Sequence, residues 1–221
     1  TLSRWMRENP KPAVGEAVLL IDQIAKGIRA MHRRETLHQD IKPDNILIDN
    51  HGQVRIVDFG ACHVAGIAEI ATPLQRDIAL GTATYSAPEY TLGLQANYRA
   101  DLFSLAVISY EMLTGKLPFG GRLEHCKRER DFLATTYTES YRLNPLVPLW
   151  IDGALKKALR FHEERRQGDV TEFVYELQHP NPRYLEYHQR PLLTRDPLQA
   201  FKILSGILIF TQVITLILLL R

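Results

Sequence analysis

Two short stretches of the chain hold residue types that phosphoryl transfer uses. The first is His38-Gln39-Asp40-Ile41-Lys42-Pro43-Asp44-Asn45, and the second, Asp58-Phe59-Gly60, begins thirteen residues after Asn45. Phosphoryl transfer needs a carboxylate near the attacking hydroxyl, a cation on the transferring phosphate and oxygen ligands for magnesium. The two stretches contain this set of groups as Asp40, Lys42, Asn45 and Asp58.

A predicted β-hairpin brings the two stretches together. The apolar-rich runs Asn45–Asp49 and Gln53–Asp58 flank Asn50-His51-Gly52, which is a turn signal. The hairpin would fold Asp58 back beside Asn45, so that both side chains face one metal-bearing pocket. Each motif alone is weak, because an isolated Asp-Phe-Gly is more often a turn. Their spacing across one hairpin favours a catalytic site.

The rest of the chain up to residue 178 is predicted to be mostly helical. Apolar residues recur at helical spacing over residues 14–31, which indicates an amphipathic helix. The segment that starts at Asp101 is apolar nearly all round, so it should lie in the core until Gly115 ends it. The segments Ile151–Phe161 and Val170–Leu177 also have helical patterns.

The C-terminal part changes composition twice. Residues 179–201 contain four prolines and several charges, which predicts a linker. Ile203–Leu220 has no charged residue over 18 positions, which predicts a transmembrane helix across 202–221 in contact with a lipid bilayer. A buried core helix is the alternative, because Gln212 lies near the middle of the run.

The distribution of charge predicts where the chain lies and which partners it lacks. Arg190, Arg195 and Lys202 precede the apolar run, so the positive-inside rule predicts a single-pass membrane protein with its globular part in the cytoplasm. A net charge of +2 gives no reason to expect nucleic acid as a partner. Cys62 and Cys126 are too few for a disulfide framework or a zinc cage.

Over residues 1–178 the sequence resembles the C-terminal lobe of the eukaryotic-type protein serine/threonine kinase family. Gly81-Thr82-Ala83-Thr84-Tyr85-Ser86-Ala87-Pro88-Glu89 resembles the substrate-docking loop and the Ala-Pro-Glu motif, and Leu117-Pro118-Phe119 resembles the segment after the central buried helix. The resemblance implies a mostly α, protein-kinase-like C-terminal lobe with a small β-hairpin, followed by the predicted transmembrane helix.

The resemblance also assigns roles to individual residues in a transfer of the γ-phosphate of ATP to serine or threonine of protein substrates. It implies that Asp40 orients the substrate hydroxyl and accepts its proton, and that Lys42 contacts the γ-phosphate. Asn45 and Asp58 would hold Mg²⁺ or Mn²⁺, and Thr82 would contact the substrate. Lys42 and Thr82 follow the serine/threonine pattern, from which tyrosine kinases usually differ.

Six further residues receive structural roles from the resemblance: His38, Phe59, Gly60, Glu89, Asp101 and Arg165. It implies that His38 packs beside Phe59. It also implies that Arg165 pairs with Glu89 in a buried salt bridge whose loss should unfold the lobe. The alternative for that pair is a surface salt bridge of little worth.

Two departures from the family pattern carry predictions. Gln39 stands where regulated kinases carry an arginine that binds a phosphorylated activation loop. Thr72 is the one hydroxyl residue between Asp58 and Gly81, so we expect Thr72→Ala to keep its activity. The sequence also lacks a Gly-x-Gly-x-x-Gly loop and the strand lysine of the N-terminal lobe. We therefore expect that lobe upstream in a longer protein, and an isolated chain that binds ATP poorly and is inactive.

The architecture further resembles bacterial membrane-anchored serine/threonine kinases, some of which also carry a 2C-type phosphatase domain. Two other readings stay open. The chain could be a membrane-bound pseudokinase scaffold that binds partners without catalysis. It could also be a small-molecule kinase of the aminoglycoside type, although those proteins lack an Ala-Pro-Glu docking segment.

Overall fold

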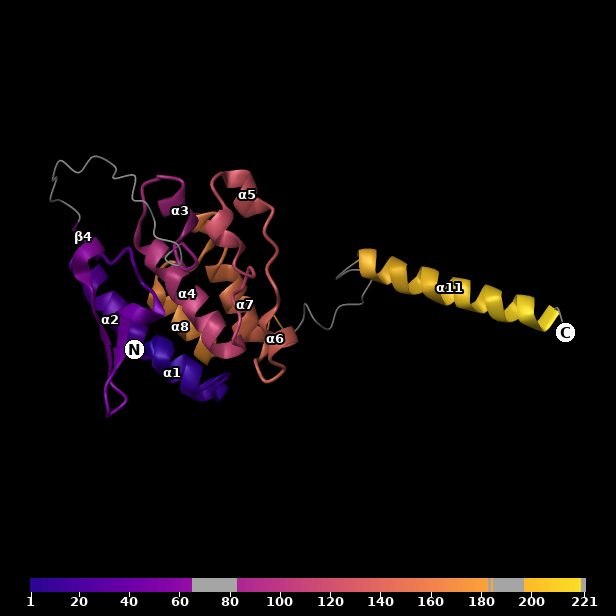
Figure 1. Ribbon diagram of the computed structural model, residues 1–221, viewed down its shortest axis with the longest axis horizontal. Helices are drawn as coiled ribbons and strands as arrows, with labels where there is room; N and C mark the ends of the chain where they lie inside the picture. The colour runs from indigo at the N-terminus through magenta and orange to yellow at the C-terminus, as the bar shows by residue number, and fades with distance from the viewer. Residues whose placement is uncertain (65–82, 183, 185–196, 220–221) are drawn as a thin grey trace. The chain divides into compact units, whose positions relative to one another are not determined.

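The computed structural model describes residues 1–64, 83–182, 184 and 197–219, and the chain divides into two compact units, 1–180 and 181–221. The first unit is mostly helical (Figure 1). Its helices are α1 (Leu2–Glu8), α2 (Val14–His32), α3 (Pro88–Thr91), α4 (Tyr98–Thr114), α5 (Glu129–Leu133), α6 (Ser140–Leu143), α7 (Leu149–Ala158) and α8 (Val170–Gln178). Short 3-10 turns are η1 (Pro43–Asn45), η2 (Phe59–Ala61), η3 (Arg122–His125) and η4 (Glu163–Arg165).

Helix α4 forms the centre of this unit, as its apolar composition predicts. It lies between α2 and α7, and α8 contacts the same two helices (Figure 1). Asn97 caps its start by accepting a hydrogen bond from the N–H of Arg99 at 2.8 Å. Gly115 ends it with a φ of 68°, a left-handed conformation that glycine adopts without strain. The helix begins at Tyr98, three residues before the predicted start at Asp101.

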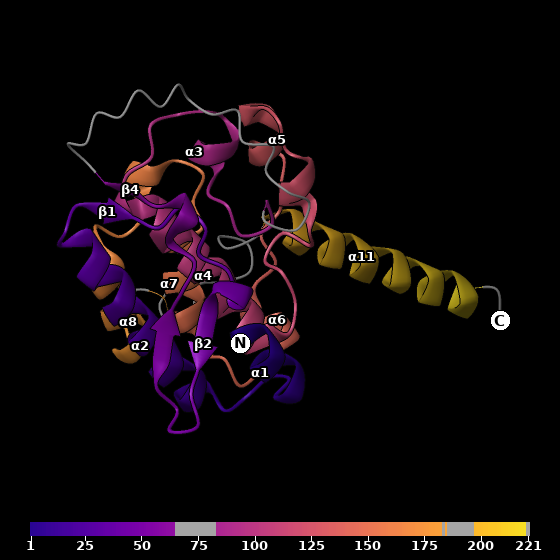
Figure 2. The same cartoon turned by 60° about the vertical axis from the view of Figure 1, so that its left-hand side comes forward.

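Two small antiparallel ribbons lie beside the N-terminal helices. The predicted hairpin is confirmed as β2 (Ile46–Ile48) and β3 (Val54–Ile56), with Leu47 opposite Arg55. A second ribbon, which the sequence did not predict, pairs β1 (Thr36–Leu37) with β4 (His63–Val64). Strands β1 and β3 contact α2, and β2 contacts α1 (Figure 2).

Helix α2 and the hairpin approach each other closely at one glycine. A Cβ atom at Gly27 would lie 2.9 Å from Cδ1 of Ile56, so the absence of a side chain at Gly27 lets β3 pack on the helix. At the far end of the hairpin, Asp49 Oδ1 accepts hydrogen bonds from the N–H groups of His51 and Gln53. These contacts fix the hairpin, and with it the positions of Asn45 and Asp58 at its open end.

The second unit contains helix α11 (Pro197–Leu219), and here the structure corrects a prediction. Among the described residues, no helix has both the length and the apolar character needed to cross a bilayer. Within the described part of α11, Ser205, Thr211 and Gln212 are polar, and a span needs about 20 predominantly apolar positions. The predicted transmembrane segment Ile203–Leu220, and the bilayer contact inferred from it, are therefore not supported.

Candidate active site

The loop before Asp40 is held by a carboxylate from the core. Asp101, in the first turn of α4, is 1% exposed. Its Oδ2 accepts hydrogen bonds from the N–H of His38 at 3.0 Å and from Nε2 of His32 at 2.9 Å. Its Oδ1 accepts from the N–H of Gln39 at 3.0 Å. Gln39 has a φ of 66°, which costs a non-glycine residue about 1–3 kcal/mol. The Asp101 carboxylate therefore stabilises a strained loop.

His38 connects this loop to the hairpin. Its Nδ1 accepts a hydrogen bond from the N–H of Asp40 at 3.3 Å, and its Nε2 donates to the carbonyl of Val57 at 3.2 Å. This pattern requires a neutral ring with the proton on Nε2. The ring centroid also lies 5.8 Å from that of Phe59, so the predicted packing of these two residues is confirmed.

The side chains of Lys42 and Asn45 both contact the carboxylate of Asp40. Lys42 Nζ lies 2.8 Å from Asp40 Oδ2, and Asn45 Nδ2 donates to the same oxygen at 3.0 Å. The second oxygen, Oδ1, is buried and accepts no hydrogen bond from the described residues. Buried carboxylate oxygens are nearly always hydrogen-bonded. Oδ1 therefore keeps an unused capacity to accept a hydrogen bond.

The backbone at Asn45 and at the residue before Asp58 comes together at the open end of the hairpin. Asn45 Nδ2 also donates to the carbonyl of Asp40 at 2.9 Å, so the amide directs its Oδ1 away from Asp40. The N–H of Val57 donates to the carbonyl of Asn45 at 2.9 Å, and Asp58 is the next residue. Asp58 is exposed, and its Oδ1 accepts from the N–H of Gly60 at 3.3 Å. A Cβ atom at Gly60 would lie 3.3 Å from the same oxygen, so glycine leaves room for this contact.

The oxygen atoms of Asn45 and Asp58 suit a divalent cation. Mg²⁺ prefers oxygen ligands and in phosphoryl-transfer sites is held by one or two carboxylates together with phosphate oxygens. Among the described residues, no group of three His, Cys, Asp or Glu side chains could form a metal cage. The hairpin brings the two backbones together, and the roles of the two side chains as ligands stay predictions.

The Ala-Pro-Glu stretch is anchored by Arg166 and not by Arg165. Arg166 Nη1 and Nη2 donate to the two carboxylate oxygens of Glu89 at 2.6 and 3.1 Å, and the two side chains are 0% and 7% exposed. Arg165 ends the η4 turn and is exposed. Successive side chains of a 3-10 turn point about 120° apart, so neighbouring arginines face different ways. The predicted buried salt bridge exists, but the sequence assigned its arginine one residue too early.

Every N–H group of the Arg166 guanidinium is hydrogen-bonded. Besides Glu89, it donates to the backbone carbonyls of Arg99, Arg160 and Phe161 at 2.8–3.0 Å. It also lies 4.9 Å from the ring centroid of Phe103. A buried ion pair stabilises a fold only when its remaining donors are satisfied, and this one meets that condition.

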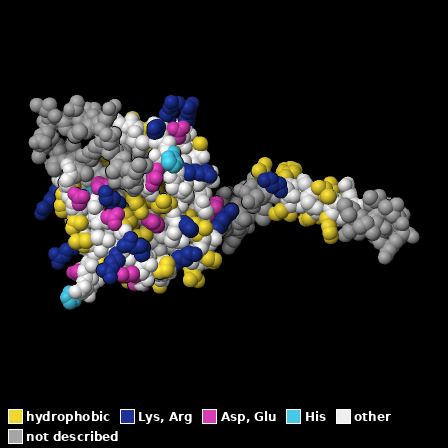
Figure 3. Space-filling model, viewed as in Figure 1, with side chains coloured by type: hydrophobic (Ala, Val, Ile, Leu, Met, Phe, Trp, Pro, Cys, Tyr) yellow, Lys and Arg dark blue, Asp and Glu magenta, His cyan; other side chains and the backbone are white. Residues whose placement is uncertain are grey.

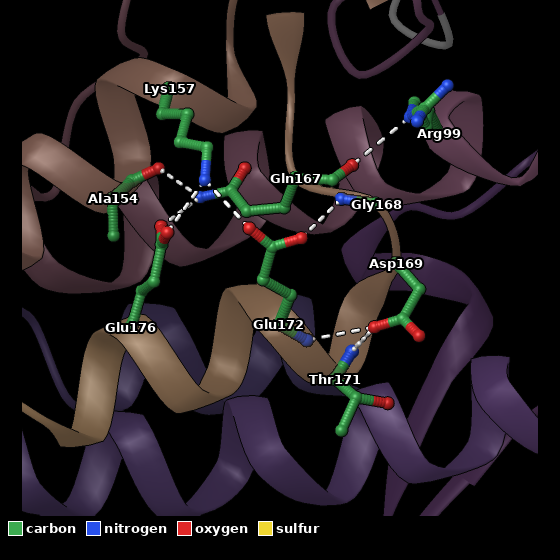
Figure 4. A network of polar contacts seen from close by, with 9 residues as sticks. All are labelled: Arg99, Ala154, Lys157, Gln167, Gly168, Asp169, Thr171, Glu172 and Glu176. Atoms are coloured by element: carbon green, nitrogen blue, oxygen red, sulfur yellow. Dashed lines mark hydrogen bonds and ion pairs between the residues drawn. The ribbon is translucent and has the colours of Figure 1, made fainter. Parts of the chain in front are cut away.

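A polar network holds the segment that follows Arg166 (Figure 4). Gln167 is fully buried, and its Nε2 donates to the carbonyl of Ala154 at 3.0 Å and to Glu176 at 2.6 Å. Lys157 joins Glu172 and Glu176 at 2.8 and 2.7 Å. These contacts attach the segment to α7 and α8, which keeps the anchoring arginine in place.

A second carboxyl group borders the Glu89–Arg166 pair. Glu163 Oε1 accepts a hydrogen bond from Asn97 Nδ2 at 2.7 Å, while its Oε2 is buried without a hydrogen bond from the described residues. Burial, and then the negative charge of Glu89, raise the pKa of Glu163. The ionised form of Glu163 therefore weakens the folded state.

We expect Glu163→Gln to raise the melting temperature at about pH 7 but not at about pH 4. A carboxyl group with a raised pKa in the folded protein lowers stability as pH rises above its unfolded pKa of about 4.3, and glutamine removes this penalty. Thermal melts at the two pH values measure the effect. The exposed neighbour Glu164→Gln is the control and should change neither melt. A gain for Glu163→Gln that persists at the lower pH would contradict the assignment.

Residues 83–89, the described part of the stretch that resembles the substrate-docking loop, are here called the docking segment. This segment is attached to the rest of the lobe at two more points. The Thr84 hydroxyl donates to the Glu124 carboxylate, and the Tyr85 hydroxyl donates to Glu111 Oε2 at 2.6 Å. Burial, and then the bond to Glu111, raise the pKa of Tyr85, so its hydroxyl keeps its proton. A pocket of about 270 Å³ is lined by Tyr85 and Glu111 and also by Pro43, the residue after Lys42.

Two predicted residues of the same region lie outside the described residues. Thr82 was expected to contact the substrate, and Thr72 was expected to be dispensable. Neither prediction can be placed in the structure. Sequence spacing also did not indicate Glu163, Arg166 or Gln167, because their roles depend on contacts with distant segments.

The family of the chain follows from comparison with known proteins. Residues 1–182 match the family described as the protein kinase domain. The chain belongs to this family.

Bacterial serine/threonine kinases are among its relatives, in agreement with the resemblance of the sequence to such kinases. Serine/threonine-protein kinase PrkC of Bacillus subtilis is 31% identical over 179 residues, which cover 77% of this chain and 26% of the relative. Probable serine/threonine-protein kinase PknB of Lactococcus lactis is 28% identical, over 80% of this chain and 28% of the relative. Serine/threonine-protein kinase PknA of Mycobacterium tuberculosis is 36% identical over 54% of this chain and 27% of the relative. The chain thus spans about a quarter of the length of these relatives. These matches do not bear on a 2C-type phosphatase domain.

Proposed function

We propose that this chain is the catalytic lower half of a protein kinase that transfers the γ-phosphate of ATP to serine or threonine of protein substrates. The buried Oδ1 of Asp40, which accepts no hydrogen bond from the described residues, carries the proposal. The other oxygen of that carboxylate is fixed by Lys42 and Asn45. A carboxylate with one oxygen held and the other left without a hydrogen-bond donor is suited to orient a hydroxyl and accept its proton.

The neighbouring side chains supply the remaining functions of this site. The Lys42 ammonium lies next to Asp40 and would contact the transferring phosphate. Asn45 Oδ1 and the Asp58 carboxylate are the oxygens that we assign to Mg²⁺ or Mn²⁺. When bound, the cation offsets the negative charge of the phosphates.

Protein substrates are favoured over small molecules by the anchored docking segment. Glu89, Thr84 and Tyr85 each bond to a different part of the lobe, so the segment is fixed at three points. We further propose that residues outside this chain complete the ATP pocket, because the sequence has no glycine-rich phosphate loop. The isolated chain should then bind ATP poorly and transfer no phosphate.

The metal role of Asp58 is testable in the full-length protein. We expect Asp58→Asn to lower phosphate incorporation from ATP by about a hundredfold or more, because it removes the one negatively charged ligand that we assign to the cation. Incorporation of labelled phosphate into protein, titrated with Mg²⁺, measures the loss. Asp44→Asn is the control, since Asp44 is exposed and close to the site. Wild-type incorporation by Asp58→Asn would instead favour the non-catalytic scaffold.

A further inference from the structure

Basic side chains gather on one exposed surface of the first unit. They belong to η3, to α5 and to the link between them. In Figure 3, dark-blue lysine and arginine side chains gather at the top of the first unit, with a few magenta acidic side chains among them. We define the basic patch as five exposed residues: Arg122, His125, Lys127, Arg128 and Arg130.

Two acidic residues of the same segment, Glu124 and Asp131, are directed to other partners, and Glu129 is exposed beside the cations. Glu124 accepts the hydrogen bond from the Thr84 hydroxyl. Asp131 Oδ2 accepts hydrogen bonds from the N–H groups of Lys127 and Arg128 at 3.1 and 3.0 Å. Asp131 thereby builds the turn that exposes these two cations. The charge offered to a partner on this surface is therefore mainly positive.

The patch also contains an exposed apolar residue. Leu133 is 57% exposed and lies three residues after Arg130, on the same face of α5. The neighbouring Phe132 is buried and packs against Phe161, which fixes the helix with Leu133 outward. Arg130 lies 3.8 Å from Asp131 with 75% of its side chain exposed, and a surface pair of this kind contributes little. Arg130 thus remains able to bind a partner.

The patch is fixed next to the segment that would receive a substrate. The bond between Glu124 and Thr84 joins η3 to the stretch that ends at Glu89. Leu123, between Arg122 and Glu124, is 4% exposed and anchors the turn in the core. A peptide bound at the docking segment could therefore reach the basic patch without any movement of the lobe.

We propose that the basic patch and Leu133 bind an acidic segment of the protein substrate that also carries an apolar residue. The proposal rests on the proposed kinase function and adds a substrate class to it. The carboxylates of an acidic peptide lie on flexible side chains, so each can pair with a separate cation of the basic patch. The closely spaced phosphates of a nucleic acid would also meet Glu129, which is exposed among the cations.

Peptide binding to the full-length protein tests the proposal. The probe is a fluorescein-labelled peptide with one serine, several glutamates and a leucine, and its comparison peptide has glutamines in place of the glutamates. Fluorescence anisotropy without ATP reports binding, so the result does not depend on phosphate transfer. We expect the glutamate peptide alone to bind, and to bind more weakly as the salt concentration rises from about 50 to about 300 mM.

Two matched variants locate the binding surface. The first combines Arg122→Gln, Lys127→Gln, Arg128→Gln and Arg130→Gln, and should weaken binding of the glutamate peptide by about tenfold. The second removes the same charge elsewhere, from four exposed residues of α2 and the turn after it: Lys26→Gln, Arg29→Gln, Arg33→Gln and Arg34→Gln. It should stay within about twofold of the unchanged protein.

Three results would overturn the proposal. They are equal binding by the two variants, equal binding of the two peptides, and tighter binding of a duplex DNA than of the glutamate peptide. If phosphate transfer is detected, the patch variant should also raise the KM for the glutamate peptide about tenfold with kcat unchanged, because binding alone is affected. If transfer is absent but the peptide binds as expected, the proposed function fails and the surface assignment stands.

Discussion

Replacing Arg166 by alanine should lower the free energy of unfolding by about 3–5 kcal/mol. The change leaves the Glu89 carboxylate buried without its cation and removes the guanidinium hydrogen bonds to three backbone carbonyls. Such a loss is a large fraction of the roughly 5–15 kcal/mol that stabilises a typical domain. Urea denaturation of the full-length protein, followed by tryptophan fluorescence, measures it.

The neighbouring arginine is the matched control for this experiment. Arg165→Ala removes the same side chain from an exposed position and should change stability by no more than about 0.5 kcal/mol. Arg166→Lys keeps the charge but cannot bind both oxygens of Glu89, so its loss should be intermediate. If Arg165→Ala destabilises the protein more than Arg166→Ala, the anchoring arginine has been assigned wrongly.

Replacing Asp101 by alanine should impair both stability and phosphate transfer. The buried N–H groups of His38 and Gln39 would lose their acceptor, which should reduce stability by about 2–4 kcal/mol. The strained loop would no longer hold Asp40 in place, and a shift of about 1 Å in such a group can lower kcat about a hundredfold. Urea denaturation and steady-state kinetics of phosphate transfer measure the two effects.

A second buried aspartate separates positioning from stability. Asp152 is 4% exposed and accepts hydrogen bonds from Tyr137 and Ser140, far along the chain from the Asp40 loop. Asp152→Ala should destabilise the protein to a similar extent, yet leave kcat of the folded fraction unchanged. An equal fall in kcat for both variants would mean that Asp101 acts through general stability alone.

The elements that carry the site were largely predictable from local signals. The turn Asn50-His51-Gly52 between two apolar runs predicted the hairpin, and the structure pairs Ile46 with Ile56 across it. The almost uniformly apolar segment after Asp101 predicted the central helix, and Gly115 marked its end. These signals depend on residues close in sequence, so they need no knowledge of tertiary contacts.

Contacts between distant segments were not predictable in the same way. Spacing alone does not distinguish Arg165 from Arg166, because the choice depends on how the η4 turn orients each side chain. Strands β1 and β4 have two residues each, which is too short for an alternating pattern to appear. The resemblance named Asp101 as a structural residue, but its bonds to His38 and Gln39 join positions more than sixty residues apart.

The rate of phosphate transfer by the full-length Asp40→Asn variant tests the proposed chemistry most directly. Asparagine preserves the size of the side chain but is a far weaker proton acceptor than a carboxylate. We predict that kcat falls by about a hundredfold to ten-thousandfold, while KM for ATP and the melting temperature stay close to those of the unchanged protein. Asp44→Asn, a nearby exposed substitution, should retain full activity. A wild-type kcat for Asp40→Asn would contradict the role of this carboxylate.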